Sequence, residues 1–212
     1  MFIARSQIGL MGKRFISKTL ILVVCLCLWG SQAIAAENPQ AVVQNGTDQV
    51  LKILAQYPED TWARREQIRA VVDGYVDFEA IARLAVGPQW KSLPPAKQQE
   101  FTLELSKLLF NTYVGDIEKY AKQNLTYNHR TINQDYVVVE ALVRDQGGPF
   151  SLGYYLHFKD GNWKVYDIAV NGMSLVANYR SQFDAMLANG SFDNLLMVLR
   201  QKIAQICGSG RC

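Results

Sequence analysis

The stretch from Gly161 to Val176, GNWKVYDIAVNGMSLV, constrains the fold more than any other part of this chain, because it combines a turn, a strand and the start of a helix. Asp160-Gly161 is a hairpin signal, since glycine takes the positive φ that such turns need. Trp163 to Val170 is rich in aromatic and β-branched residues and predicts a strand. Gly172 permits a sharp exit, and Ser174 can cap the helix that follows. This segment therefore joins a hairpin, a sheet and a helix that can pack on that sheet.

Side-chain alternation along this strand predicts two faces. One face carries Trp163, Val165, Asp167 and Ala169, and the other carries Lys164, Tyr166, Ile168 and Val170. Both faces are largely apolar, so we expect other parts of the chain to cover both. Asp167 is the exception, because a buried carboxylate needs hydrogen-bond partners or a raised pKa. Structural hydrogen bonding is the preferred interpretation of Asp167, and catalysis or contact with a bound ligand is the alternative.

Hydrophobic periodicity and capping residues divide the rest of the chain into helices and strands. Helices are expected over residues 38–59, 63–75, 78–86, 95–117, 174–188 and 191–203, and strands over 125–132, 136–144, 150–158 and 163–170. Short turns between neighbouring strands imply an antiparallel meander, and helices on both sides of the strands in sequence give an α+β order. The predicted fold is a four-stranded antiparallel sheet covered by helices, with an N-terminal helical portion.

The first 36 residues have the features of a cleaved secretory signal peptide. They contain the basic residues Arg5, Lys13, Arg14 and Lys18, an uncharged apolar run from Leu20 to Trp29, and the small-x-small site Ala33-Ile34-Ala35. The apolar run is shorter than the roughly 20 residues that span a bilayer, although a retained membrane anchor is the alternative. Loss of the segment leaves 18 basic residues against 19 acidic ones, a formal net charge of −1. The charge therefore gives no indication of a nucleic-acid partner.

The remaining chain is long enough for one domain with a sizeable core. We expect a single α+β domain over residues 37–206, with a helical part at about 41–122, a sheet at about 125–170 and C-terminal helices at about 174–206. Residues 207–212 are expected to form a short tail rich in glycine and cysteine. Cys207 and Cys212 can close a small disulfide loop in an oxidising compartment, but the sequence leaves their state open.

Two long blocks resemble the MlaC or toluene-tolerance family. The first is GNWKVYDIAVNGMSLVANYRSQF, from Gly161 to Phe183, and the second is VDFEAIARLAVGPQW, from Val76 to Trp90. The likeness extends over most of the chain from about Thr47 to Leu199, in the same order and spacing. Members of this family are periplasmic phospholipid-binding proteins, auxiliary to an ABC transporter. The resemblance implies a carrier that moves phospholipid between an inner-membrane ABC transporter complex and an outer-membrane lipoprotein complex, maintaining outer-membrane lipid asymmetry without a cofactor.

The resemblance also implies an apolar cavity between the sheet and the helices, where the acyl tails are held. Aromatic and aliphatic residues gather in the long helix, the sheet and the helix that follows the sheet. The candidate lipid-binding residues are Leu108, Tyr113, Val138, Tyr154, Leu156, Tyr166, Ile168, Tyr179 and Phe183. For any one of them an ordinary place in the core is the alternative. Tyrosine suits the mouth of such a cavity, because its ring is apolar and its tip is polar.

Catalytic and metal-binding signatures are missing from the sequence, so no enzyme is predicted. There are only two histidines, His129 and His157, and no HExxH, CxxC, Gly-x-Ser-x-Gly, Walker or dinucleotide fingerprint. Asp77 is best interpreted as a helix cap. Three alternatives remain: a small isomerase or hydratase that uses Asp167 and His157, an adaptor with a packed interior, and a carrier of another apolar molecule.

Overall fold

A computed structural model describes residues 38–120, 125–145 and 148–208 of the chain. The helices are α2 (Pro39–Gln56), α3 (Thr61–Tyr75), α4 (Phe78–Val86), the 3-10 helix η1 (Gly87–Ser92), α5 (Pro95–Tyr120), α6 (Leu175–Asn189) and α7 (Phe192–Gly208). The strands are β1 (Leu125–Asn133), β2 (Tyr136–Asp145), β3 (Gly148–Lys159), β4 (Asn162–Val170) and β5 (Met173–Ser174). The proposed signal peptide and Cys212 lie outside the described residues. Among the described helices, none is long and apolar enough to cross a membrane.

The strands form one antiparallel sheet in the order β1-β2-β3-β4-β5, which confirms the α+β class and the meander. The sheet has one strand more than predicted. Asn171 and Gly172, with φ of 48° and 78°, make a tight turn that folds Met173 and Ser174 back onto β4. Ser174 still caps α6, since its hydroxyl accepts a hydrogen bond from Ala177 N at 2.9 Å. A strand of two residues is too short to show a recognisable alternation of apolar and polar side chains in the sequence.

A β-bulge corrects the two faces predicted for β4. Tyr155 pairs with Asp167 and Leu156 pairs with Val165, so the register shifts and Tyr166 is the additional residue. Such an insertion reverses the phase of the side chains beyond it. Val165 and Ile168 consequently pack in the same apolar cluster, although strict alternation had placed them on opposite faces.

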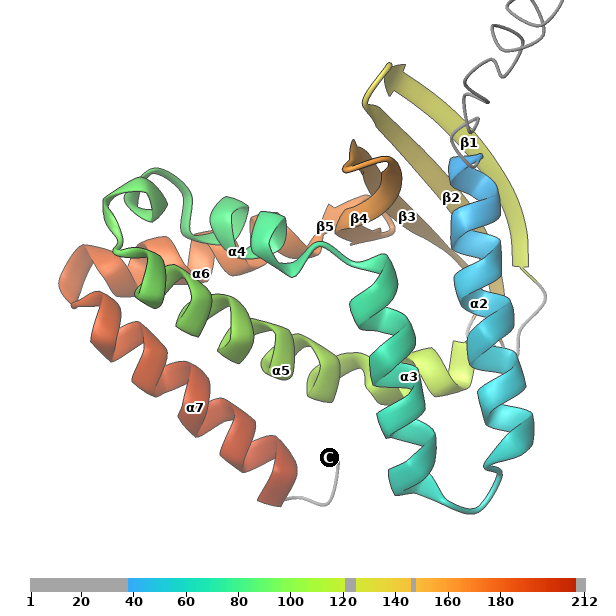
Figure 1. Ribbon diagram of the computed structural model, residues 1–212, viewed down its shortest axis with the longest axis horizontal. Coiled ribbons are helices and arrows are strands. Elements are labelled where there is room, and N and C mark those ends of the chain that lie inside the picture. Colours follow the sequence, from blue (N-terminus) through green and yellow to red (C-terminus); the bar gives the residue numbers. More distant parts are fainter. Residues whose placement is uncertain (1–37, 121–124, 146–147, 209–212) are drawn as a thin grey trace, which may run out of the picture. The chain divides into compact units, whose positions relative to one another are not determined.

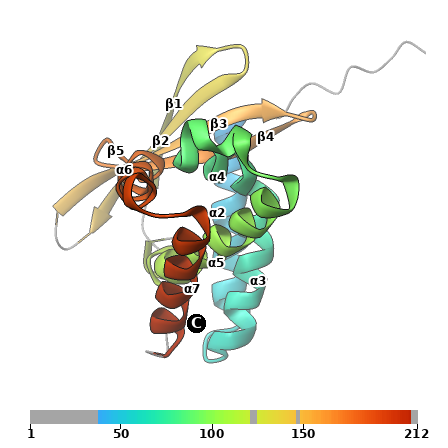
Figure 2. The same ribbon diagram turned by 90° about the vertical axis from the view of Figure 1, so that its left-hand side faces the viewer.

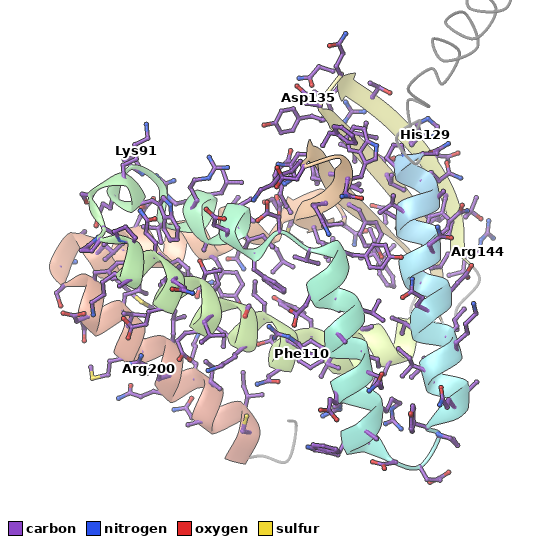
Figure 3. All side chains as sticks on the ribbon, in the orientation of Figure 1. Lys91, Phe110, His129, Asp135, Arg144 and Arg200 are labelled. Atoms are coloured by element: carbon purple, nitrogen blue, oxygen red, sulfur yellow. The ribbon has the colours of Figure 1, made fainter. Side chains whose placement is uncertain are left out.

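Helices α2 and α3 form a hairpin that joins the sheet to α5. At one end of α2, which runs along the sheet (Figure 1), Val42 and Val43 pack against strands β2, β3 and β4. At its other end, Val50 and Leu54 pack with α3 and α5, where Phe110 is buried (Figure 3). The hairpin therefore contributes to two separate apolar clusters.

The remaining helices form a third cluster of their own. In Figure 2 the sheet lies above α5 and α7, and α7 packs along α5. Phe101 of α5 is fully buried at the centre, with its ring centroid 5.6 Å from that of Phe183 and 5.2 Å from that of Phe192. Helix α7 continues to Gly208 and so contains Cys207, which the sequence had assigned to the tail. Cys207 is a disulfide-bonded half-cystine.

Candidate functional site

A cavity of about 1090 Å³ lies between the inner face of the sheet and the helices. Its walls come from α2, α3, α4, α5, β1, β3, β4, β5 and α6. On the sheet side they include Leu152, Tyr154 and Ile168, and on the α5 side they include Leu109 and Phe110. The volume is slightly above the range of about 300–1,000 Å³ that is typical of small-molecule pockets. The space is therefore large enough for a ligand of considerable apolar surface.

The cavity exists because the apolar clusters form around it. The sheet packs on α2, α3, α4 and α6, whereas α5 packs on α3, α4 and α7. The α2–α3 hairpin bridges the two assemblies through its separate clusters, and it holds the inner face of the sheet away from α5. Tyr154 of β3 and Phe110 of α5 consequently line the same cavity from the sheet side and from the helix side.

The lining is mostly apolar, and its hydroxyl groups are in low-polarity surroundings. Burial raises the pKa of Tyr154, and burial also raises the pKa of Tyr113 and Tyr179, whose hydroxyls are hydrogen-bonded to one another. Among the described lining residues none is basic, and the acidic ones are Asp116 and Asp167. The site therefore favours binding by apolar contact over binding by charge.

Asp167 is buried, and both oxygens of its carboxylate accept hydrogen bonds from the protein. One oxygen accepts hydrogen bonds from Ile168 N at 2.8 Å and from Val176 N at 3.0 Å, and the other accepts from the hydroxyl of Ser174. Val176 lies in the first turn of α6, where free N–H groups and the helix dipole favour a carboxylate. The carboxylate thus fastens α6 to the strand, as the preferred interpretation of the sequence expected.

His157 pairs with Asp77 and not with Asp167. Its Nε2 lies 3.1 Å from Asp77 Oδ2, and Lys159 Nζ donates to the same oxygen at 2.9 Å. Asp77 also caps α4, as predicted, by accepting from Ala80 N at 2.9 Å. Asp77 and His157 are outside the cavity lining, and the described residues include no group of three or more side chains suited to a metal ion. The arrangement fits a structural junction between α4 and β3.

The structure brings four of the nine candidate residues together in the cavity wall. These are Tyr113, Tyr154, Ile168 and Tyr179. Their contact with lipid stays a prediction.

The other five lie elsewhere. Leu108 and Phe183 are in the helical cluster around Phe101, and Leu156 packs under α2. Val138 lies between two strand neighbours that face α2, so it points to the other side of the sheet. Tyr166 lies there too, with its ring 5.3 Å from that of His157.

Sequence reasoning missed the wall contributed by α2 and α3. It consists of Val42, Val43, Gly46, Thr47, Val50, Val71, Val72 and Tyr75. A signal was present, because the α2 members recur at helical spacing on one side of the helix. That periodicity identifies a buried face but does not say whether the face meets protein or a cavity.

Fold and site together define the chain as an α+β protein that encloses a large, mostly apolar cavity between an antiparallel sheet and its covering helices. The model of the MlaC protein family matches residues 44–201. The chain therefore belongs to the MlaC family.

Individual relatives agree with this assignment. Toluene tolerance protein ttg2D of Pseudomonas putida is 25% identical over 178 residues, covering 80% of this chain and 83% of the relative. The intermembrane phospholipid transport system binding protein MlaC of Haemophilus influenzae is 20% identical over 196 residues, covering 88% and 92%. Among solved structures, the phospholipid-binding protein from Ralstonia solanacearum, determined in complex with a phospholipid, matches with a TM-score of 0.72 and 28% identity. That match covers 80% of this chain and 99% of the other.

Proposed function

We propose that this chain is a periplasmic carrier that holds a phospholipid by its acyl tails and moves it between an inner-membrane ABC transporter complex and an outer-membrane lipoprotein complex. The observation that carries the proposal is the apolar cavity of about 1090 Å³ between sheet and helices. The naming of one relative as part of an intermembrane phospholipid transport system, and the phospholipid bound to a structural neighbour, support it. Maintenance of outer-membrane lipid asymmetry would be the consequence of this transport.

Energetics explain why a carrier needs such a cavity. Each CH₂ group transferred to water costs about 0.8 kcal/mol, so exposing two ordinary acyl tails costs on the order of 20–25 kcal/mol. A few polar contacts cannot offset that cost. An apolar cavity needs only to match the interior of a bilayer, so exchange with a membrane is close to neutral. The headgroup can remain in water, which agrees with a lining in which no described residue is basic.

Native mass spectrometry of the exported protein, isolated without detergent, tests the proposal. We expect about one phospholipid per chain, identified after organic extraction. The decisive variant is Gly46→Phe, because Gly46 lines the cavity and an added Cβ would meet the ring of Tyr75 at an ordinary 3.6 Å. The rest of the new side chain would occupy space meant for the tails, and we expect lipid content to fall at least threefold.

Gly74→Phe is the matched control. Gly74 also lies in a helix, is exposed, is not part of the cavity lining and has nothing within 4 Å of an added Cβ. This variant should retain lipid, and circular dichroism should give the same helix content for both. A wild-type preparation with no apolar ligand would overturn the proposal. A different apolar molecule in place of phospholipid would support the alternative of a carrier with another cargo.

A further inference from the structure

Within the part of the chain that the structure describes, most of the exposed cavity wall lies at one edge of the sheet. The lining residues that are exposed to solvent are Val170, Asn171, Met173, Ala177, Asn178 and, from α5, Asp116. All but Asp116 lie at the end of β4, in the turn to β5, in β5 itself or in the first turn of α6. The lining residues of α2 and α3 are buried or partly buried. Among the described residues, the edge formed by residues 170–178 is therefore the most solvent-exposed stretch of the cavity wall.

This edge is fixed to the fold by hydrogen bonds on both sides. Asn171 N donates to Ser151 O at 2.9 Å, and Ser151 N donates to the side-chain oxygen of Asn171 at 3.0 Å. On the other side, the hydroxyl of Ser174 donates to Asp167. These bonds anchor the turn to β3 and to β4 and hold the edge in place against the sheet.

Met173 is an unusual residue to find at this edge. Its exposed fraction of 72% is, with that of Trp62, the highest among the large apolar side chains of the described residues, yet it also forms part of the cavity wall. Val170, at 37% exposed, pairs with it across the turn. Leu175 and Val176 continue the apolar surface inward. Methionine is flexible and adapts to irregular apolar partners, so Met173 and Val170 give this edge apolar surface beside the polar side chains of Asn171 and Asn178.

We propose that acyl chains enter and leave the cavity over Met173, an inference that rests on the proposed function. The side chain of Met173 is then a positioning residue that sets the rate of lipid transfer. A tail that is halfway out has lost its contacts with the interior and has not yet reached another apolar phase. Exposed apolar surface at the mouth covers part of the tail in that state. Met173 should therefore affect uptake and release equally and leave the amount of bound lipid unchanged.

Transfer kinetics separate this role from a structural one. Vesicles of phosphatidylethanolamine and phosphatidylglycerol that contain a pyrene-labelled phospholipid are mixed with the full chain, and excimer fluorescence is followed during uptake and during release to unlabelled vesicles. We expect Met173→Ser to slow both rates at least fivefold, with equilibrium loading within twofold of wild type. Met173→Leu should restore the rates, because it restores apolar surface.

Met197→Ser is the control, since Met197 is 48% exposed on α7 and is outside the cavity lining. It should transfer lipid like wild type. Wild-type rates for Met173→Ser would overturn the inference, and so would a loss of equilibrium loading with unchanged rates. Absence of uptake by the wild-type chain would instead overturn the proposed function, so the two failures are distinguishable.

Discussion

At the scale of single residues, Asp77 illustrates how one carboxylate can hold two elements together. Burial acts to raise its pKa, but hydrogen bonds from Lys159 and Ala80 N, together with the charges of Lys159 and His157, outweigh burial and lower it. The pKa of Asp77 is therefore lower in the folded chain than its value of 3.8 in the unfolded chain. The charged carboxylate consequently stabilises the fold above pH 3.8, and this stabilisation is lost as the pH falls through the pKa of the folded chain.

Asp77→Asn should therefore destabilise the fold near neutral pH. Asparagine can still cap α4, so the variant removes the charge and the strong hydrogen bond from Lys159, a loss of about 2 kcal/mol. Urea unfolding at pH 7 measures this loss, and the difference from wild type should shrink as the pH falls below 3.8 and through the lowered pKa of Asp77 in the folded state. Glu79→Gln is the control, because Glu79 is 67% exposed and lies 3.7 Å from Lys159. An Asp77→Asn variant as stable as wild type at pH 7 would contradict this account.

Gly87 presents a second test at this scale. It ends α4 with φ of +68°, and an added Cβ would lie 1.9 Å from Nη1 of Arg180. Gly87→Ala should lower the free energy of unfolding by about 2 kcal/mol or more, since it combines an unfavourable backbone conformation with a clash. Combining it with Arg180→Ala should recover the part caused by the clash. Equal losses in the single and the double variant would show that backbone strain alone is responsible.

At the scale of secondary-structure elements, the sequence predicted long segments well and their detailed contacts less well. Local sequence signals alone are enough to predict the strand from Trp163 to Val170 and the helix from Phe78 to Val86. These signals are the residue types of the strand and the apolar period and capping residue of the helix. The bulge at Tyr166 depends on how β3 pairs with β4, which local pattern does not encode. This explains the mixed outcome for the site, because a change of phase decides whether residues such as Tyr166 and Ile168 face the cavity.

The junction between α3 and α5 gives a prediction at the element scale. Burial acts to raise the pKa of Glu118, but hydrogen bonds from Arg65 and Arg64 outweigh it and lower the pKa. These arginines lie on α3 and Glu118 lies on α5, with Arg64 Nε at 2.9 Å from Oε1. Glu118→Gln should loosen the hairpin at this junction, with a loss of about 1 kcal/mol.

Hydrogen exchange followed by mass spectrometry can locate that effect. Faster exchange is expected in α2 and α3 and unchanged exchange in α7, because the ion pairs connect only the hairpin to α5. Asp184→Asn is a suitable control, since Asp184 lies on α6 and pairs with Arg180 of the same helix at 2.7 Å. Uniformly faster exchange throughout the chain would mean that the hairpin is not an independent unit.

At the scale of the whole molecule, the cavity has opposite effects on stability when it is empty and when it is full. A cavity of about 1090 Å³ leaves its lining without packing partners, which costs free energy in the lipid-free protein. A bound ligand adds stability that grows with its free concentration relative to its dissociation constant. Stability and lipid content are therefore linked, and a change that fills the cavity must act on both.

Gly46→Phe should consequently reverse its rank against wild type when lipid is removed. With lipid bound, the wild-type chain should melt at the higher temperature, because the variant holds less ligand. After delipidation, the variant should be the more stable by about 1 kcal/mol, since its ring fills part of the cavity and replaces a helical glycine. Scanning calorimetry of both proteins in both states measures the crossing. Equal stability of loaded and delipidated wild type would contradict this account, because a ligand that binds only the folded chain must raise its stability.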